Sequence, residues 1–276
     1  MSLDTQAVSD HYTRGDLGEA ILAALAETGL NTDKLEPGDL SALDQFHFRG
    51  LEATRDQTEL VELDVDTHVL DVGCGIGGPA RYLASEFGCR VTGLDLTEEF
   101  CRVATMLAER TGLADRAVFR QGDALDMPFK DASFDLVWTQ HAAMNIADKA
   151  RLYGEMHRVL KPGGRLALYD IAQGPGGPLH FPVPWARRPE ISFLTTPESL
   201  RAGVEAAGFR IDVFRDVSEA GLEWRKKITE KIARDGTPPL GLHIVMGAEW
   251  PQMFANVGRN LEEERIRLIQ LVARKG

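Results

Sequence analysis

Residues 69–84, V-L-D-V-G-C-G-I-G-G-P-A-R-Y-L-A, run from apolar residues through a glycine-rich turn into a helical pattern. Two fingerprints fit these glycines. Gly73, Gly75 and Gly78 form G-x-G-x-x-G, which is typical of dinucleotide-binding loops. Counting instead from Asp71 gives D-x-G-x-G-x-G. Both fingerprints predict a strand, a tight loop and a helix, but they predict different ligands, so residues outside the loop must decide between them.

From this stretch onward, short apolar runs alternate with helical patterns. We expect strands near residues 67–72, 90–95, 116–121, 134–139, 164–171, 209–216 and 265–274. We expect helices near residues 79–88, 98–112, 148–160, 197–207 and 218–235. This alternation predicts βαβ units, and therefore an α/β fold with a mostly parallel, doubly wound sheet. An amphipathic helix over residues 17–30, ending at Gly29, precedes the pattern.

The composition is that of a folded, enzyme-sized protein. A chain of 276 residues with 43% hydrophobic residues can bury a substantial core. The formal net charge of -11 has the wrong sign for binding nucleic acid or an anionic membrane, so we expect neither as a partner. No apolar run reaches membrane-spanning length and the N-terminus lacks a signal-peptide pattern, which favours a soluble, cytoplasmic monomer or homodimer.

The three cysteines, Cys74, Cys89 and Cys101, favour the same compartment. They form no C-x-x-C motif and no pairing with histidine at zinc spacing. We therefore expect a reducing environment and no metal.

Acidic and polar residues end the first four expected strands. The first three strands end at Asp71, Asp95 and Asp123, and the fourth ends at Gln140 and His141. In a doubly wound sheet the ligand lies beyond the carboxyl ends of the strands, so these side chains should meet there. Because an aspartate at position 71 would repel a pyrophosphate, the set favours a cationic nucleoside without phosphate. We interpret the ligand as S-adenosylmethionine, with S-adenosylhomocysteine as its product.

The quoted motifs resemble, in order, those of the class I S-adenosylmethionine-dependent methyltransferases. V-L-D-V-G-C-G-I-G-G, G-L-D-L-T, G-D-A, F-D-L-V-W and R-V-L-K-P-G-G-R all match, over about residues 65–275. The chain is most similar to the ubiquinone-type, tocopherol and sarcosine/dimethylglycine methyltransferases. The resemblance implies a Rossmann-like sheet of seven strands whose last strand is antiparallel.

The same resemblance implies the organisation of the chain and its cofactor contacts. Residues 1–64 would form an N-terminal helical cap and a substrate-pocket segment, and residues 65–276 the methyltransferase domain, with lid segments at 172–197 and 218–258. The implied cofactor-binding residues are Asp71, Gly73, Gly75, Gly77, Asp95, Leu96, Asp123, Ala124 and Gln140.

His141 and Tyr12 are the candidate catalytic residues. His141 follows the fourth strand on the cofactor side of the sheet, and histidine is the usual base near neutral pH. Its alternative role is that of a hydrogen-bonded loop residue. Tyr12 precedes the first expected helix, which in this family folds over the cofactor, so it could cap the sulfonium. A surface tyrosine is the alternative.

Residues 36–66 and 172–197 interrupt the alternation and are candidate walls of an acceptor pocket. Gln45 and His47 place polar groups between aromatic residues in the first of them. In the second, which is rich in proline, Trp185 could hold a methylated ammonium and Arg187 a carboxylate, as a zwitterionic acceptor would need. Packing within the lid, for Trp185, and solvation, for Arg187, are the alternatives.

The expected activity is methyl transfer by in-line displacement to a small-molecule acceptor, with N-methylation slightly favoured over C- or O-methylation. Two alternatives stay open. One is a methyltransferase fold that keeps its cofactor as a scaffold and acts as a cyclase or a binding protein. The other is a nicotinamide-dependent oxidoreductase that uses the G-x-G-x-x-G loop.

Overall fold

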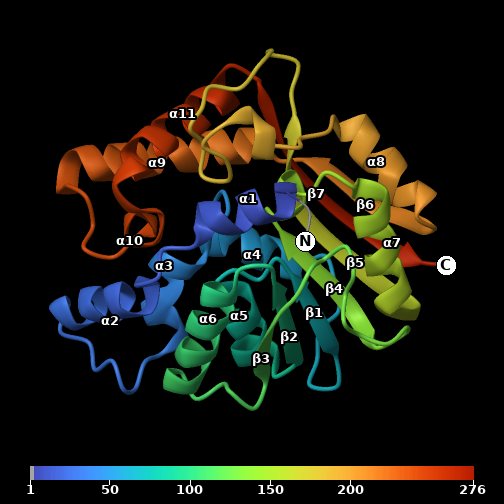
Figure 1. The fold of residues 1–276 in the computed structure, drawn as a ribbon, viewed down its shortest axis with the longest axis horizontal. Helices are drawn as coiled ribbons and strands as arrows, with labels where there is room; N and C mark the ends of the chain where they lie inside the picture. The colour runs from blue at the N-terminus through green and yellow to red at the C-terminus, as the bar shows by residue number, and fades with distance from the viewer. Residues whose placement is uncertain (1–2) are drawn as a thin grey trace.

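A single seven-stranded sheet organises the computed structural model, which describes residues 3–276. The strand order is β3-β2-β1-β4-β5-β7-β6, and all pairs are parallel except those that β7 makes with β5 and β6 (Figure 1). The strands are β1 (His68–Val72), β2 (Arg90–Asp95), β3 (Ala117–Gln121), β4 (Phe134–Gln140), β5 (Leu160–Gln173), β6 (Phe209–Asp216) and β7 (Ile266–Lys275). The predicted seven-stranded α/β sheet with an antiparallel last strand is thus confirmed.

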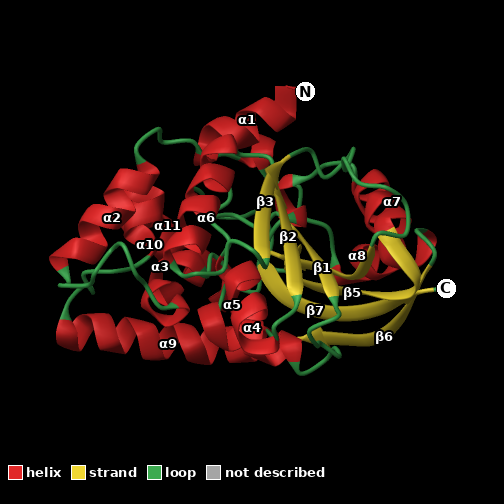
Figure 2. Ribbon diagram, turned by 90° about the horizontal axis from the view of Figure 1, so that it is seen from below, coloured by secondary structure: helices red, strands yellow, loops and turns green. Residues whose placement is uncertain are grey.

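Helices cover both faces of the sheet because successive strand residues point to opposite sides (Figure 2). On β1, Val69 packs in the cluster that includes α5, whereas Leu70 packs in the cluster that includes α7 and α8. The helices that connect the strands are α5 (Gly78–Phe87), α6 (Glu98–Arg110), α7 (Lys149–Val159), α8 (Pro197–Ala206), α9 (Ser218–Asp235), α10 (Leu242–Met246) and α11 (Trp250–Glu262).

The seven predicted strands and the five predicted helices of the alternating region all form, within a few residues of the expected bounds. The amphipathic helix predicted at 17–30 is α2 (Leu17–Glu27), which buries Leu17, Ile21 and Leu25. In contrast to the expectation, Tyr12 does not precede the first helix, because it is the last residue of α1 (Leu3–Tyr12). Residues 36–66 also hold more regular structure than expected.

Five short elements precede the sheet, and α1 lies across the carboxyl ends of the strands (Figure 1). Besides α1 and α2, the elements of this N-terminal part are the 3-10 helix Pro37–Leu40, α3 (Ser41–Asp44) and α4 (Gly50–Thr58). The N-terminal part therefore packs onto the edge of the sheet where the aspartates were predicted to gather.

A buried ion pair holds this N-terminal part against the glycine-rich turn. Nη2 of Arg81, on α5, donates to Oδ2 of Asp44, on α3, at 2.8 Å. Both side chains are buried, and Nη1 of Arg81 also donates to the carbonyl oxygen of Ile76, inside the turn, at 2.7 Å. Burial raises the pKa of Asp44 and lowers that of Arg81, while each partner's charge opposes the shift. Because both groups are desolvated, removing one of them leaves the other buried without a counter-charge, which costs free energy.

We expect Asp44→Ala to lower the free energy of unfolding by about 3–5 kcal/mol, because it leaves the Arg81 guanidinium buried without its partner. Urea unfolding followed by tryptophan fluorescence measures the loss. The double variant Asp44→Ala/Arg81→Met should recover most of it, since it removes both charges together. A loss of less than about 1 kcal/mol in the single variant would contradict this role of the pair.

Candidate functional site

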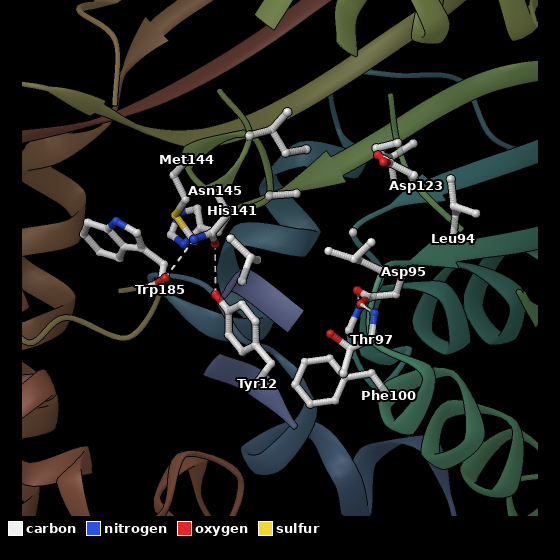
Figure 3. Close-up of a pocket in the computed structure, with 18 of the residues that line it drawn as sticks. Tyr12, Leu94, Asp95, Thr97, Phe100, Asp123, His141, Met144, Asn145 and Trp185 are labelled. Atoms are coloured by element: carbon white, nitrogen blue, oxygen red, sulfur yellow. Dashed lines mark hydrogen bonds between the residues drawn. The ribbon is translucent and has the colours of Figure 1, made fainter. Parts of the chain in front are cut away.

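A cavity of about 400 Å³ opens at the carboxyl ends of β1, β2 and β4, beneath α1. Its lining falls into two groups (Figure 3). The β1–β3 end is formed by the residues that follow the first three strands, including Gly73, Gly75, Asp95, Leu96, Thr97, Asp123 and Ala124. The β4 end is formed by residues after β4 together with α1 and the proline-rich loop, including Val8, Tyr12, His141, Met144, Asn145, Pro184 and Trp185.

The loop after β1 needs glycine at two crowded positions. Gly73 has φ 75°, and a Cβ built there would lie 2.4 Å from Cβ of Ala142. Gly77 has φ 80°, and its Cβ would lie 2.5 Å from the ring of Phe119. Gly75 also has a left-handed backbone, but no atom lies within 4 Å of its Cβ position. Gly75 lines the cavity, so its backbone is accessible to a ligand. Gly77 does not line the cavity, and its lack of a side chain allows close packing against Phe119.

Asp95 at the end of β2 is tied to the glycine-rich loop. Its Oδ2 accepts from the amide of Gly75 at 2.9 Å, and its Oδ1 accepts from the amide of Thr97 at 2.9 Å. Burial raises the pKa of Asp95, and the two amides oppose this rise. Each oxygen still has a second lone pair, so the carboxylate can accept two hydroxyls from a ligand.

Asp123, after β3, extends the β1–β3 end. Its Oδ1 accepts from the amide of Leu125 at 2.8 Å, and its side chain faces the same cavity as Leu96 and Ala124 (Figure 3). The arrangement therefore pairs carboxylate oxygens with apolar side chains, as a nucleoside requires.

Asp71 lies behind the loop rather than in the cavity lining. It is 2% exposed, and its Oδ2 has no hydrogen-bond partner among residues 3–276. Burial, and secondarily the charge of Asp95, raises the pKa of Asp71 to about 8. A carboxylate in this position lacks the positive charge that would compensate for its burial.

Gln140 ends β4 with its amide orientation fixed. Nε1 of Trp138 donates to Oε1 of Gln140 at 3.1 Å, and an indole N–H can only donate. Nε2 of Gln140 donates to Oε1 of Gln57, on α4, at 3.4 Å. Because an amide nitrogen carries two hydrogens, the second N–H of Gln140 can serve the cavity that this residue lines.

Gln45 and His47 do not line the cavity; they lie buried behind Gln140. The hydroxyl of Thr54, on α4, lies 2.8 Å from Oε1 of Gln45, 3.1 Å from Nε2 of His47 and 3.3 Å from Oε1 of Gln140. The expected pocket wall over residues 36–66 is thus represented in the lining by Phe46, while Gln45 and His47 join a polar network that supports Gln140.

His141 lines the cavity directly after Gln140. Its backbone is left-handed, with φ 51°, and its amide donates to the carbonyl oxygen of Tyr169 at 2.8 Å. Its ring centroid lies 4.8 Å from that of Tyr169 and 5.9 Å from that of His47. Burial, with a smaller contribution from His47, holds the pKa of His141 well below its usual value, and Nε2 has no hydrogen-bond partner among the described residues. The imidazole is therefore neutral.

Asn145 connects the two segments that cover the β4 end. The hydroxyl of Tyr12 donates to its Oδ1 at 3.0 Å (Figure 3). Its Nδ2 donates to the carbonyl oxygens of Trp185, at 2.7 Å, and Ile191, at 3.0 Å. Neither Asn145 nor Met144 was predicted as a site residue from the sequence, although both closely follow the fourth strand. Their short distance from His141 along the chain was the available signal.

The two residues predicted in the proline-rich loop have different environments. Trp185 lines the cavity but is 1% exposed, and its Nε1 donates to Oγ of Ser192 at 2.9 Å. Arg187 lies outside the cavity lining, because its Nε donates to Oε2 of Glu249 at 2.5 Å on the surface. The predicted clamp on an acceptor carboxylate therefore has no support in its position.

Residues 3–276 contain neither a membrane-spanning helix nor a cluster of metal ligands. The described helices include none with the length and hydropathy needed to cross a membrane. Nor do these residues gather three or more histidine, cysteine, aspartate or glutamate side chains in a metal-binding arrangement.

Comparison with known proteins gives concordant similarities. Residues 70–168 match the family model described as a methyltransferase domain. The chain is 35% identical to the methyltransferase GfsG of Streptomyces halstedii over 170 residues, which is 60% of this chain. It is 29% identical to the 27-O-demethylrifamycin SV methyltransferase of Amycolatopsis mediterranei over 220 residues, covering 78% of this chain and 80% of that protein. The crystal structure of the [4+2]-cyclase SpnF superposes with a TM-score of 0.69 at 26% identity, covering 98% of this chain and 96% of that one.

The extent of these matches differs between relatives. The chain spans 58% of the length of GfsG, and two further relatives are matched over only 29% and 27% of their lengths. The family model covers most of β1, the whole of β2 to β4 and part of β5, together with the residues that follow the first four strands.

Proposed function

We infer that this chain, which carries a class I S-adenosylmethionine-dependent methyltransferase domain, transfers a methyl group from S-adenosylmethionine to a small-molecule acceptor. The observation that carries the proposal is the buried carboxylate of Asp71, which lies beside Asp95 beneath a glycine-rich loop and whose Oδ2 has no hydrogen-bond partner among residues 3–276. A phosphate-bearing ligand would add negative charge there, whereas an amino-acid ammonium and a sulfonium supply the missing positive charge.

The residues present fit this cofactor. Asp95 would accept the ribose hydroxyls and Asp123 the adenine amine, with Leu96 and Ala124 against the base. Gly75 would offer its open backbone to the amino-acid part, near Asp71. This placement follows the position of each residue in the cavity and the polarity of its side chain.

Gln140 fits the carboxylate of the cofactor's amino-acid part. The indole of Trp138 fixes the amide so that its nitrogen, rather than its oxygen, is free to donate. A donor is the group that a carboxylate needs.

At the β4 end, the protein would position an acceptor and receive its proton. S-adenosylmethionine supplies a methyl group activated by positively charged sulfur. Neutral His141 can accept a proton from an acceptor, and Tyr12 with Asn145 joins α1 to the proline-rich loop over the cavity. Placement of the acceptor and exclusion of water are the main contributions expected of the protein.

A second candidate function is favoured by the likeness to the [4+2]-cyclase SpnF, which extends over nearly the whole of both chains. In that case the cofactor would be a scaffold and no methyl group would be transferred. The nicotinamide-dependent alternative is disfavoured, because the carboxylate of Asp71 lies beneath the loop that would have to hold a pyrophosphate.

Calorimetric titration with S-adenosylhomocysteine and, separately, with NAD tests the cofactor. We expect binding of the first and none of the second. Asp95→Asn should weaken S-adenosylhomocysteine by about 1.5–3 kcal/mol, because charge-assisted hydrogen bonds are lost. Asp131→Asn, which changes a carboxylate outside the cavity lining, is the matched control. Binding of NAD in preference would overturn the proposal, and binding without methyl release from labelled cofactor would favour the scaffold alternative.

The affinity for S-adenosylhomocysteine should depend on pH through Asp71. Its pKa is raised to about 8, so the carboxylate that complements the ligand's ammonium is fully present only above that pH. As the pH falls below 8, affinity should decrease, by up to about tenfold per pH unit, since protonated Asp71 must first lose its proton. Titrations across this range measure the slope. Asp71→Asn should flatten it, and an unchanged slope in that variant would assign the dependence to another group.

His141→Asn should lower kcat by about 10²–10⁴-fold, as expected for loss of a general base. Affinity for S-adenosylhomocysteine should stay within about twofold, because His141 lies at the opposite end of the cavity from Asp95 and Asp123 (Figure 3). Single-turnover transfer of labelled methyl groups gives kcat, and calorimetry gives affinity. Full activity in the variant would leave His141 with a role in shaping the loop only.

A further inference from the structure

Apart from the exposed Asp148, the β4 end of the cavity contains no side chain with a formal charge. The charged residues that line the whole cavity are Asp95, Asp123 and Asp148, and no lysine or arginine lines it within residues 3–276. Asp95 and Asp123 belong to the β1–β3 end, and Asp148 is exposed at the start of α7, where its Oδ1 accepts from the amide of Arg151. The surroundings of an acceptor are thus apolar or neutral.

The nearest cations are already engaged outside the lining. Nζ of Lys149 donates to the carbonyl oxygens of Ala143, at 2.8 Å, and Phe193, at 2.7 Å, and also to that of Ile146. The guanidinium of Arg187 is paired with Glu249. An acceptor with a carboxylate or phosphate would therefore enter a negatively biased cavity without a cation to hold it.

The nearby carboxylate that could hold an ammonium is engaged as well. The side chain of Asp170 is 1% exposed and lies behind the turn that follows His141. Its Oδ2 accepts from the amide of Ala143 and its Oδ1 from the amide of Ile171, each at 2.8 Å. A positively charged amine beside Met144 and Trp185 would lose its hydration without gaining a counter-charge.

Besides Gln140, whose free N–H is assigned to the cofactor, one polar group at this end has unused capacity. The ring of His141 lines the cavity, and its Nε2 has no partner within the described part of the chain. By contrast, Tyr12, Asn145 and the indole N–H of Trp185 are all bonded within the protein. A neutral imidazole can bind and deprotonate a hydroxyl, which brings no charge into the cavity before reaction.

We propose that the acceptor is an uncharged, predominantly apolar molecule that presents one hydroxyl group to His141, so that the chain is an O-methyltransferase for neutral alcohols or phenols. This inference rests on the proposed function, and it departs from the zwitterionic amine that the sequence favoured. The acceptor's O–H proton passes to the imidazole, and the oxygen's electron pair forms the new O–C bond. The electron pair of the broken C–S bond remains on sulfur, giving an uncharged ether, S-adenosylhomocysteine and a proton that His141 later releases.

The chemical class of the product can be determined without knowing the acceptor. Purified protein is incubated with S-adenosylmethionine carrying a labelled methyl group and a protein-free extract of the cells that make it. The products are then partitioned between water and ethyl acetate at about pH 2 and about pH 11, where amines and acids, respectively, are charged. An uncharged ether should enter the organic phase at both values.

Each outcome separates the two proposals. Label that enters the organic phase only at the alkaline pH identifies an amine product, and label that enters it only at the acidic pH identifies an acid; either would overturn the neutral-acceptor inference while leaving methyl transfer intact. Unreacted S-adenosylmethionine stays in water at both values because its sulfonium is always charged. Absence of any labelled product, with S-adenosylhomocysteine still bound, would contradict the proposed function itself.

A substitution at the β4 end tests the source of the selectivity. Met144→Lys places a cation beside the acceptor and should reduce formation of the neutral product at least about tenfold, through the cost of burying a charge near an apolar molecule. Met144→Leu, which keeps the side chain apolar, should change it by less than about threefold. Unchanged affinity for S-adenosylhomocysteine shows that the variants are folded. Equal activity of the two variants would contradict the inference. If Met144→Lys does not fold, the solvent partition of the product made by the unmodified protein tests the inference instead.

Discussion

Two carboxylates end neighbouring parallel strands without a cation between them, and the rest of the site depends on how they are accommodated. Asp95 is stabilised by the amides of Gly75 and Thr97, whereas Oδ2 of Asp71 has no partner among residues 3–276. Desolvation therefore raises the pKa values of both groups, and the charge of Asp95 adds to the rise at Asp71. Below about pH 8 a proton neutralises Asp71, and a positively charged ligand can take the place of that proton. This exchange selects the ligand more sharply than the glycines do.

The sequence was most informative where local pattern and topology agree. Strands such as β1 and β4 are buried on both faces, so they were recognisable as short, nearly continuous hydrophobic runs. The rule that parallel strands end at one edge brought Asp71, Asp95 and Gln140 together. It was least informative for α1 and α4, whose stability comes from packing on the finished sheet rather than from strong amphipathic patterns. The expected bounds of most helices also differed from the observed bounds by one to three residues.

Roles that depend on long-range pairing were beyond the sequence. Gln45 and His47 are polar residues in an aromatic segment, and only the fold shows that Thr54 connects them with Gln140 rather than with the cavity. Arg187 likewise depends on Glu249, 62 residues further along the chain. Asn145 forms hydrogen bonds with α1 and with the proline-rich loop, and the spacing of residues within one segment cannot predict contacts between segments.

The hydrogen bonds of Asn145 with α1 and the proline-rich loop also affect the rate at which ligands enter and leave the cavity. Helix α1 meets the proline-rich loop through few polar contacts. Nε2 of His11 lies 2.9 Å from the carbonyl oxygen of Pro184, Nη1 of Arg187 lies 3.4 Å from Nδ1 of His11, and Tyr12 reaches the loop through Asn145. Each is worth about 1 kcal/mol, far less than the stability of the sheet beneath. Separation of α1 from the loop is thus a local opening that leaves the sheet intact, and turnover can be paced by this gate instead of by the chemical step.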